Sequence, residues 1–202
     1  MGSLLLGGGA GGLGGAAAAH LLVTLANRFG GAQTWLKGPF GPPFFDVAFY
    51  MGVLCLGIAL GLSRKPKPAA LAFLGPFLGM ALPLAVLTRT ARWGMDPGAP
   101  PTFAWVYAVR VIYTFGTWGT LLGLGAMLAS GRRALSALAG AAGALLGFAV
   151  LEGLFRILPD QAAFYWSPDR LVAPPVELLD GLLTGAGLGV GIWLVARRRV
   201  GS

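Results

Sequence analysis

The sequence predicts an all-α membrane protein with six transmembrane helices arranged as three helical hairpins, and two observations carry this prediction. Hydrophobic residues make up 56% of the 202 residues and charged residues only 11%, whereas soluble domains carry roughly 25% charge. Apolar runs follow one another along the whole chain, each near the ~20 residues that a helix needs to cross the hydrocarbon core. We therefore expect one transmembrane domain over residues 1–202. A soluble fold and a disordered chain are both excluded.

Two kinds of break alternate between the apolar runs. The expected helices cover about 3–26, 44–63, 69–88, 103–129, 134–157 and 175–196. Three breaks are short and basic, and they hold Arg64, Lys65 and Lys67, then Arg132 and Arg133, then Arg197, Arg198 and Arg199. The other three, at about 27–43, 89–102 and 158–174, are longer and contain Trp, Pro and Asp. Because Lys and Arg concentrate in cytoplasmic loops, we expect both termini on the cytoplasmic side of a cell (inner) membrane.

The formal net charge of +8 follows from this orientation. The three basic breaks hold all the unbalanced cations, and the remaining cations and acids are equal in number. A nucleic-acid-binding protein would instead need a basic stripe on a folded surface. We therefore expect membrane lipids, and no nucleic acid, as partners.

The three hairpins resemble one another. Each long break holds a Trp and enters its next helix through a Pro-Pro pair: Pro42-Pro43, Pro100-Pro101 and Pro174-Pro175. This pattern indicates internal duplication or convergence, since Pro suits the first turn of any helix and Trp favours the membrane interface. In the third helix, Pro76 and Pro83 each remove a hydrogen bond, which predicts a bend.

Glycine and alanine recur at four-residue spacing in every expected helix, as in Gly57 and Gly61 or Gly181 and Gly185. Such pairs let helix backbones approach closely. We expect these pairs mainly to pack helices within the chain. The same helix faces are also compatible with an oligomer. In the first helix, Ala16 to Ala19 also resemble a signal-peptide cleavage site, but no positive residue precedes Leu4. We expect this helix to be retained.

Ionisable residues inside the apolar runs all lie in the outer half of the membrane. Arg110, Glu152 and His20 come out roughly 8–10 Å below the outer helix ends at 1.5 Å per residue. Asp46, Glu177 and Asp180 occupy the first or second outer turns of the expected second and sixth helices. Such residues usually face the bundle interior and are functional candidates. Hydroxyl groups at similar depth that add hydrogen bonds are those of Tyr50, Tyr107, Tyr113, Thr24 and Thr114.

Three interpretations of this polar layer remain open. In the leading one, the protein acts on a lipid or lipid-linked substrate at the outer leaflet, with Glu152, Glu177 and Asp180 as catalytic acids or bases. The candidate substrate-binding residues are then Arg110, Arg156, Arg92, His20 and Asp46. The alternatives are a non-catalytic subunit of a membrane complex, in which Arg110 pairs with Glu152 or Asp180, and a small-solute transporter. Whether the protein is an enzyme is thus left open by the sequence.

No cofactor or metal ion is expected. His20 is the only His and Cys55 the only Cys, so sites built from several of either residue are excluded. The glycine-rich stretch 7–15 lacks the strand and the Lys of a phosphate-binding loop. A buried, hydrogen-bonded structural role is the simplest alternative for His20.

Overall fold

In the computed structural model, the residues that the structure describes are 2–28, 44–76, 78–79, 116, 118–128, 133–157 and 172–197. Regular secondary structure in these ranges is helical throughout, which confirms the all-α class. The elements are α1 (Gly2–Arg28), α3 (Phe44–Ser63), α4 (Pro66–Pro76), α7 (Arg133–Ile157) and α8 (Pro175–Arg197). A further apolar helix covers Trp118–Leu128.

Four of these helices lie where the sequence predicts them. The bounds of α1, α3, α7 and α8 agree with the expected first, second, fifth and sixth helices to within two residues. The expected third helix begins earlier, because Pro66 takes its first position, and its regular α-helix ends at Pro76. Residues 78–79 are π-helical, and a Pro that interrupts the helix hydrogen bonds favours such a local change of helix type. Pro83 and most of the expected fourth helix lie outside the described residues.

Two described helices are long and apolar enough to cross a membrane, at Gly2–Ala26 and Pro175–Ala196. Three shorter apolar helices cover Ala48–Ser63, Trp118–Leu128 and Ala134–Gly147. Length and composition therefore support membrane association at this coarse level.

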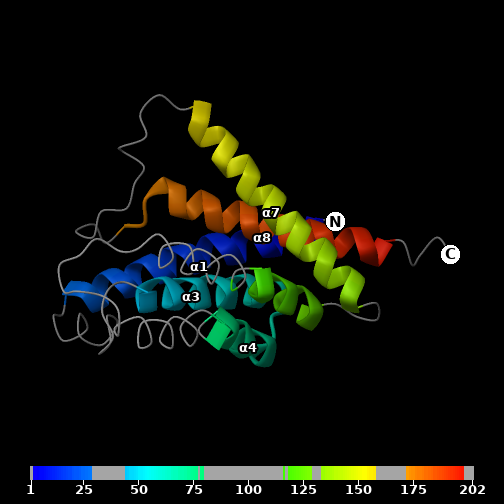
Figure 1. The fold of residues 1–202 in the computed structure, drawn as a ribbon, viewed down its shortest axis with the longest axis horizontal. Coiled ribbons are helices and arrows are strands. Elements are labelled where there is room, and N and C mark those ends of the chain that lie inside the picture. The colour runs from blue at the N-terminus through cyan, green and yellow to red at the C-terminus, as the bar shows by residue number, and fades with distance from the viewer. Residues whose placement is uncertain are drawn as a thin grey trace, which may run out of the picture.

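Helix α1 lies between α3 and α8 (Figure 1). α1 packs against both α3 and α8, α7 packs on α8, and α4 packs on α3. Contacts between Gly7 and Gly61 and between Gly8 and Gly185 show that α1 runs antiparallel to both neighbours. The α1/α3 and α7/α8 pairs correspond to the first and third expected hairpins.

Glycines bring these helices into backbone contact. Gly7, Gly11 and Gly15 of α1 face α3, whereas Gly8 and Gly12 face α8. A Cβ atom on Gly12 would meet the carbonyl oxygen of Gly181. The same spacing joins α7 to α8, with Gly143 and Gly147 against Gly187 and Leu183. The small residues thus pack helices within the chain, as expected.

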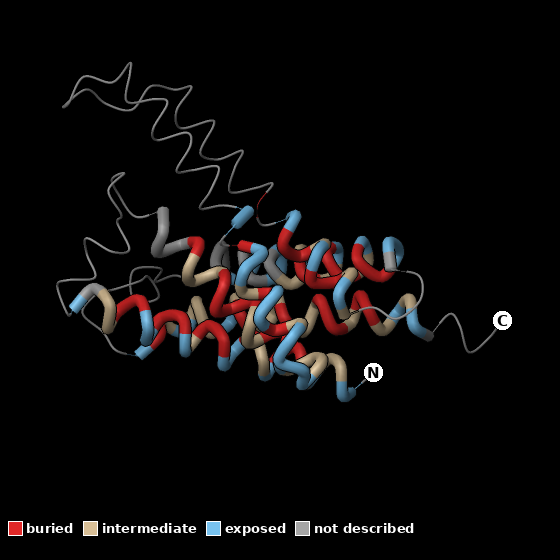
Figure 2. Tube along the Cα trace, turned by 90° about the horizontal axis from the view of Figure 1, so that it is seen from below, coloured by how far each residue is buried: buried red, intermediate tan, exposed pale blue. Residues whose placement is uncertain are grey.

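Buried residues lie on the stretches of helix that face one another (Figure 2). The largest are Leu54, Ile58, Leu124 and Leu188, which belong to one apolar cluster. Leucines also line the outward faces of α1 and α7, including Leu6, Leu13, Leu138 and Leu146. Exposed apolar surface of this extent is typical of a helix that contacts lipid or another protein.

A short basic turn joins α3 to α4. Arg64 adopts a positive φ of 53°, and its backbone N–H donates to the Leu60 carbonyl at 2.9 Å, which ends α3 in a left-handed cap. Pro66 then begins α4, where its missing N–H costs nothing. Arg64, Lys65 and Lys67 are all exposed at this turn.

Candidate functional site

A polar cluster lies at the end of the bundle opposite the α3–α4 turn. We call this end the polar end; it is formed by the C-terminal end of α1 and the N-terminal ends of α3 and α8. The cluster consists of His20 and Thr24 on α1, Tyr50 on α3, and Glu177 and Asp180 on α8.

Helix register explains how His20 meets Glu177. Gly8 lies against Gly185 and Gly12 against Gly181. Continued in four-residue steps, this register brings His20 opposite Ala173 and places Glu177 one turn deeper. Side chains on a helix lean toward its N-terminus. Because α1 and α8 are antiparallel, His20 and Glu177 lean toward each other and close this offset.

The resulting contact is a buried hydrogen bond. His20 Nδ1 lies 2.9 Å from Glu177 Oε2, the His20 side chain is fully buried, and the Glu177 side chain is 16% exposed. A carboxylate accepts hydrogen bonds, so this contact assigns a proton to Nδ1. When the ring carries one proton, Nε2 is then its basic nitrogen.

The start of α8 holds Glu177 in place. Pro175 is the first residue of the helix, and the Pro174 carbonyl accepts from the backbone N–H of Glu177 at 3.0 Å and of Leu178 at 3.3 Å. Glu177 therefore lies in the first turn, where the positive end of the helix dipole favours a carboxylate.

Asp180 follows Glu177 by one turn on the same face of α8. It accepts a hydrogen bond from Thr184 Oγ1 at 3.2 Å, and it lies close enough to act electrostatically on Glu177. The two carboxylates thus form one acidic patch on α8.

Two hydroxyl groups complete the cluster. The Tyr50 hydroxyl lies near the Glu177 carboxylate, but it does not meet the geometry of a hydrogen bond with that group or any other. Thr24 is fully buried, and its Oγ1 likewise has no hydrogen-bond partner. Thr24 follows His20 by four residues and so shares its helix face.

Among the residues selected from the sequence, the structure brings together His20, Glu177 and Asp180. Asp46 lies in the first turn of α3 at the same polar end; its side chain is outside the description. Arg92 and Arg110 lie outside the described residues altogether.

The C-terminal end of α7 carries Glu152 and Arg156, whose side chains are not described. α7 crosses α8, and this end diverges from the start of α8 (Figure 1). Gly147 still contacts Leu183, whereas a Cβ on Gly153 would meet nothing. The backbone of α7 is therefore not held against the His20–Glu177 pair.

Sequence reasoning missed the pairing of His20 with Glu177 and the contribution of Thr184. A usable signal was present for both. Aligning Gly8 and Gly12 antiparallel with Gly181 and Gly185 would have placed His20 near Glu177, and Thr184 follows Asp180 at the four-residue spacing of helix neighbours.

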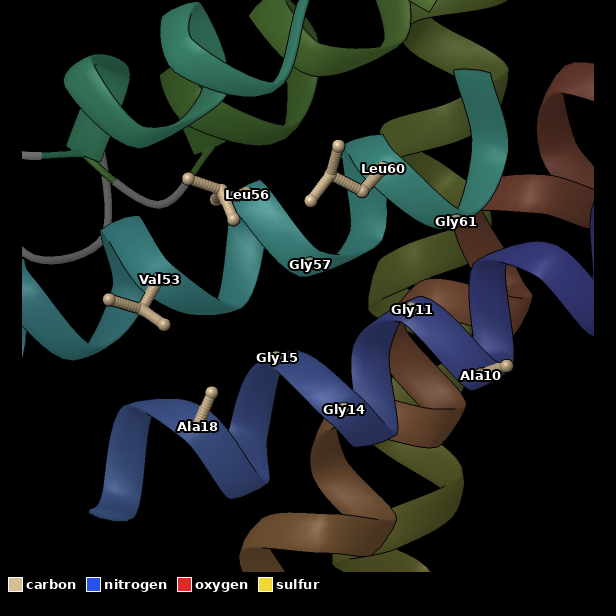
Figure 3. A pocket seen from close by; sticks show the side chains of 10 residues that line it. All are labelled: Ala10, Gly11, Gly14, Gly15, Ala18, Val53, Leu56, Gly57, Leu60 and Gly61. Carbon is tan, nitrogen blue, oxygen red and sulfur yellow. The ribbon is translucent and has the colours of Figure 1, made fainter. Parts of the chain in front are cut away.

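The described helices also form an apolar groove of about 440 Å³ between α1 and α3 (Figure 3). Small residues of α1 and larger ones of α3 line it, among them Ala10, Gly14, Ala18, Val53, Leu56 and Leu60. Its lining has no polar side chain, so the groove cannot perform acid–base chemistry. The polar cluster is therefore the better candidate site.

Within the described ranges, no three His, Cys, Asp or Glu side chains come close enough together to hold a metal ion. The chain matches no known protein family, no curated protein and no solved structure. The chemistry must therefore be argued from the cluster itself. An imidazole whose Nδ1 is held by a carboxylate is an arrangement suited to general acid–base catalysis.

Proposed function

We propose that the protein is a multi-pass protein of the cell inner membrane with six transmembrane helices and both termini in the cytoplasm. Two long apolar helices and the outward leucines of α1 and α7 support this proposal. The exposed cations of the α3–α4 turn lie at the end opposite the polar cluster, and the preference of cations for the cytoplasmic side supports an outer location for the cluster.

The proposed activity is acid–base catalysis on a lipid or lipid-linked substrate that enters from the outer leaflet. The observation that carries it is the buried 2.9 Å contact between His20 and Glu177. Glu177 orients the imidazole, and His20 takes up or releases a proton of the substrate. Asp180 adds a second carboxylate close to this pair. Glu152, Arg92, Arg110 and Arg156 stay candidates for contacting the rest of the substrate.

A transport function has less support. The segments 2–19 of α1, 51–63 of α3 and 181–196 of α8 contain no Asp, Glu, Lys, Arg or His. A transport path normally has polar lining or broken helices near the membrane midplane. These three described segments therefore offer no acidic, basic or imidazole side chain between the two ends of the bundle.

A non-catalytic subunit is the second candidate. The complete burial of the His20 side chain between α1 and α8 favours it, because a satisfied histidine can also serve to lock two helices together.

Replacement of Glu177 by Gln separates these candidates. Wild-type protein and Glu177→Gln would be reconstituted in liposomes of total membrane lipid, and the lipids analysed by mass spectrometry over time. We expect at least one lipid species to be converted by the wild type and conversion to fall about 100-fold or more in Glu177→Gln.

Ser136→Ala is the matched control, because Ser136 is a buried polar residue near the start of α7, away from the cluster. It should leave conversion unchanged. Identical lipid profiles for wild type and Glu177→Gln, with both proteins folded, would exclude the enzymatic function and favour the subunit.

A further inference from the structure

Within the part of the chain that the structure describes, the hydroxyl groups of Thr24 and Tyr50 are buried polar groups that the His20–Glu177 contact leaves unexplained. Neither has a hydrogen-bond partner, and both oxygen atoms are shielded from solvent. The large majority of buried polar atoms in folded proteins are hydrogen-bonded. Two hydroxyls that lack a hydrogen-bond partner and belong to the same cluster as the acid–base pair therefore indicate a binding position for another polar group.

The two hydroxyls come from different helices, Thr24 from α1 and Tyr50 from α3. Thr24 follows His20 by one turn on the same face of α1, and Tyr50 of α3 lies near Glu177 of α8. Of the two paired side chains, that of Glu177 is partly exposed, at 16%, whereas that of His20 is fully buried. A ligand would therefore enter past Glu177 and meet the two hydroxyls beside His20.

The charges of the cluster limit the kind of ligand. Hydroxyl groups donate to an oxygen acceptor such as a carbonyl, a phosphoryl group or water. The neighbouring carboxylates of Glu177 and Asp180 repel a negatively charged phosphate in a low-dielectric environment. An uncharged carbonyl oxygen suffers no such repulsion.

The depth of the cluster fits a lipid ester. The apolar span of α1 ends at Ala26, which puts Thr24 about 3 Å and His20 about 9 Å inside that end. Ester groups link the acyl chains of a lipid to its head group and so lie at this boundary between hydrocarbon and interface.

We propose that Thr24 and Tyr50 bind the ester carbonyl of a membrane lipid and hold it beside His20 and Glu177. This inference rests on the proposed action on lipids and names the substrate class. Thr24 and Tyr50 are then the residues that contact the substrate, and the His20–Glu177 pair is the acid–base group next to it.

A pair of probes that differ only in the carbonyl tests the proposal. Protein purified in dodecyl maltoside, a detergent without esters, would be titrated with a monoacylglycerol and with the ether-linked monoalkylglycerol of equal chain length. At ten times its Kd, the ester should raise the Tm of the wild type by roughly 3–5 °C. The ether should bind roughly two- to tenfold more weakly, because it lacks the acceptor.

The variants Thr24→Val and Tyr50→Phe should each remove this preference for ester over ether. Without ligand they should keep the wild-type Tm or exceed it, because they delete buried hydroxyls that have no partner. Thr120→Val is the matched control, since Thr120 Oγ1 donates to the Gly116 carbonyl at 2.7 Å. It should lose stability and keep the preference.

Equal binding of ester and ether would overturn the proposal and leave water as the occupant of the two hydroxyls. Tighter binding of a lysophosphatidic acid through Thr24 and Tyr50 would overturn it in favour of a phosphate ligand. A Tm loss of several degrees in both ligand-free variants would show that the hydroxyls serve the fold. Ester-selective binding without lipid conversion would uphold this binding site while the proposed catalysis fails.

Discussion

The contact between His20 and Glu177 joins residues 157 positions apart in the chain. His20 has little access to water, and Glu177 is only partly exposed. Loss of one partner leaves the other buried without a hydrogen bond, which costs its full desolvation free energy. Loss of both partners removes this cost. The two residues should therefore depend on each other energetically, whatever the reaction.

A double-mutant cycle measures this dependence. We expect His20→Ala and Glu177→Ala each to lower the free energy of unfolding by about 1–3 kcal/mol. The double variant should lose less than the sum, with a coupling of about 0.5–3 kcal/mol. The measurement is unfolding in mixed micelles followed by circular dichroism.

Ser136→Ala provides the comparison for that cycle, because Ser136 lies near the start of α7. Combined with His20→Ala, its effect should add to within about 0.5 kcal/mol. Full additivity between His20 and Glu177 as well would mean that their contact contributes nothing to stability.

At the residue scale, the sequence could name the members of the cluster but not their partners. His20, Glu177 and Asp180 are recognisable because ionisable groups are costly in apolar segments. Pairing depends on which helices are neighbours, and nothing local to His20 specifies α8. The alternative of a buried, hydrogen-bonded His20 is compatible with the observed contact, as is its role in a site.

Helices of this chain are held together by stripes of glycine. α1 uses Gly7, Gly11 and Gly15 for α3, and Gly8 and Gly12 for α8. Where lipid replaces water, close backbone packing takes over much of the role that hydrophobic burial has in soluble proteins. The position of each glycine on α1 should therefore decide what its replacement costs.

Gly12 and Gly14 form a matched pair for testing this. A Cβ on Gly12 would collide with the Gly181 carbonyl, whereas one on Gly14 would meet no atom within 4 Å. We expect Gly12→Ala to separate α1 from α8 and to lower Tm by several degrees. Gly14→Ala should be neutral or stabilising by up to about 1 kcal/mol, because Ala favours the helix. Thermal unfolding in one detergent compares the two, and equal losses would contradict the packing described for α1.

The bounds of the helices were largely predictable, because Pro pairs and basic residues separate the apolar runs. The start of α8 at Pro175 follows from the Pro174-Pro175 pair, and the end of α3 from Arg64 and its neighbours. The start of α4 at Pro66 was missed, because Lys67 was counted with the break. A helix can begin with Pro and Lys, because its first turn can lie before the apolar part of the helix.

At the scale of the molecule, the helical class followed from composition, but the neighbours of each helix did not. Hairpin reasoning correctly pairs α1 with α3 and α7 with α8. It says nothing of the packing of α1 on α8, which builds the polar cluster. Which hairpins pack together depends on the complementary shapes of their side-chain surfaces, and these shapes form only when the helices are folded.

The proposed orientation makes a prediction for the whole chain. Alkaline phosphatase fused after Arg28 or after Val172 should be active, and after Lys67 or at the C-terminus inactive, because that enzyme works only outside the cytoplasm. Green fluorescent protein at the same positions should show the opposite pattern and serves as the control. Active phosphatase after Lys67 would reverse the orientation and place the cluster on the cytoplasmic side.

The side-by-side packing of α1 and α8 also has a consequence for biosynthesis. Ribosomes add roughly 5–20 residues per second, so α8 emerges on the order of 8–30 s after α1. During that interval α1 can already pair with α3, while His20 still lacks Glu177. The polar cluster is therefore among the last parts to form, and a chain that stops before Pro175 would lack the His20–Glu177 pair.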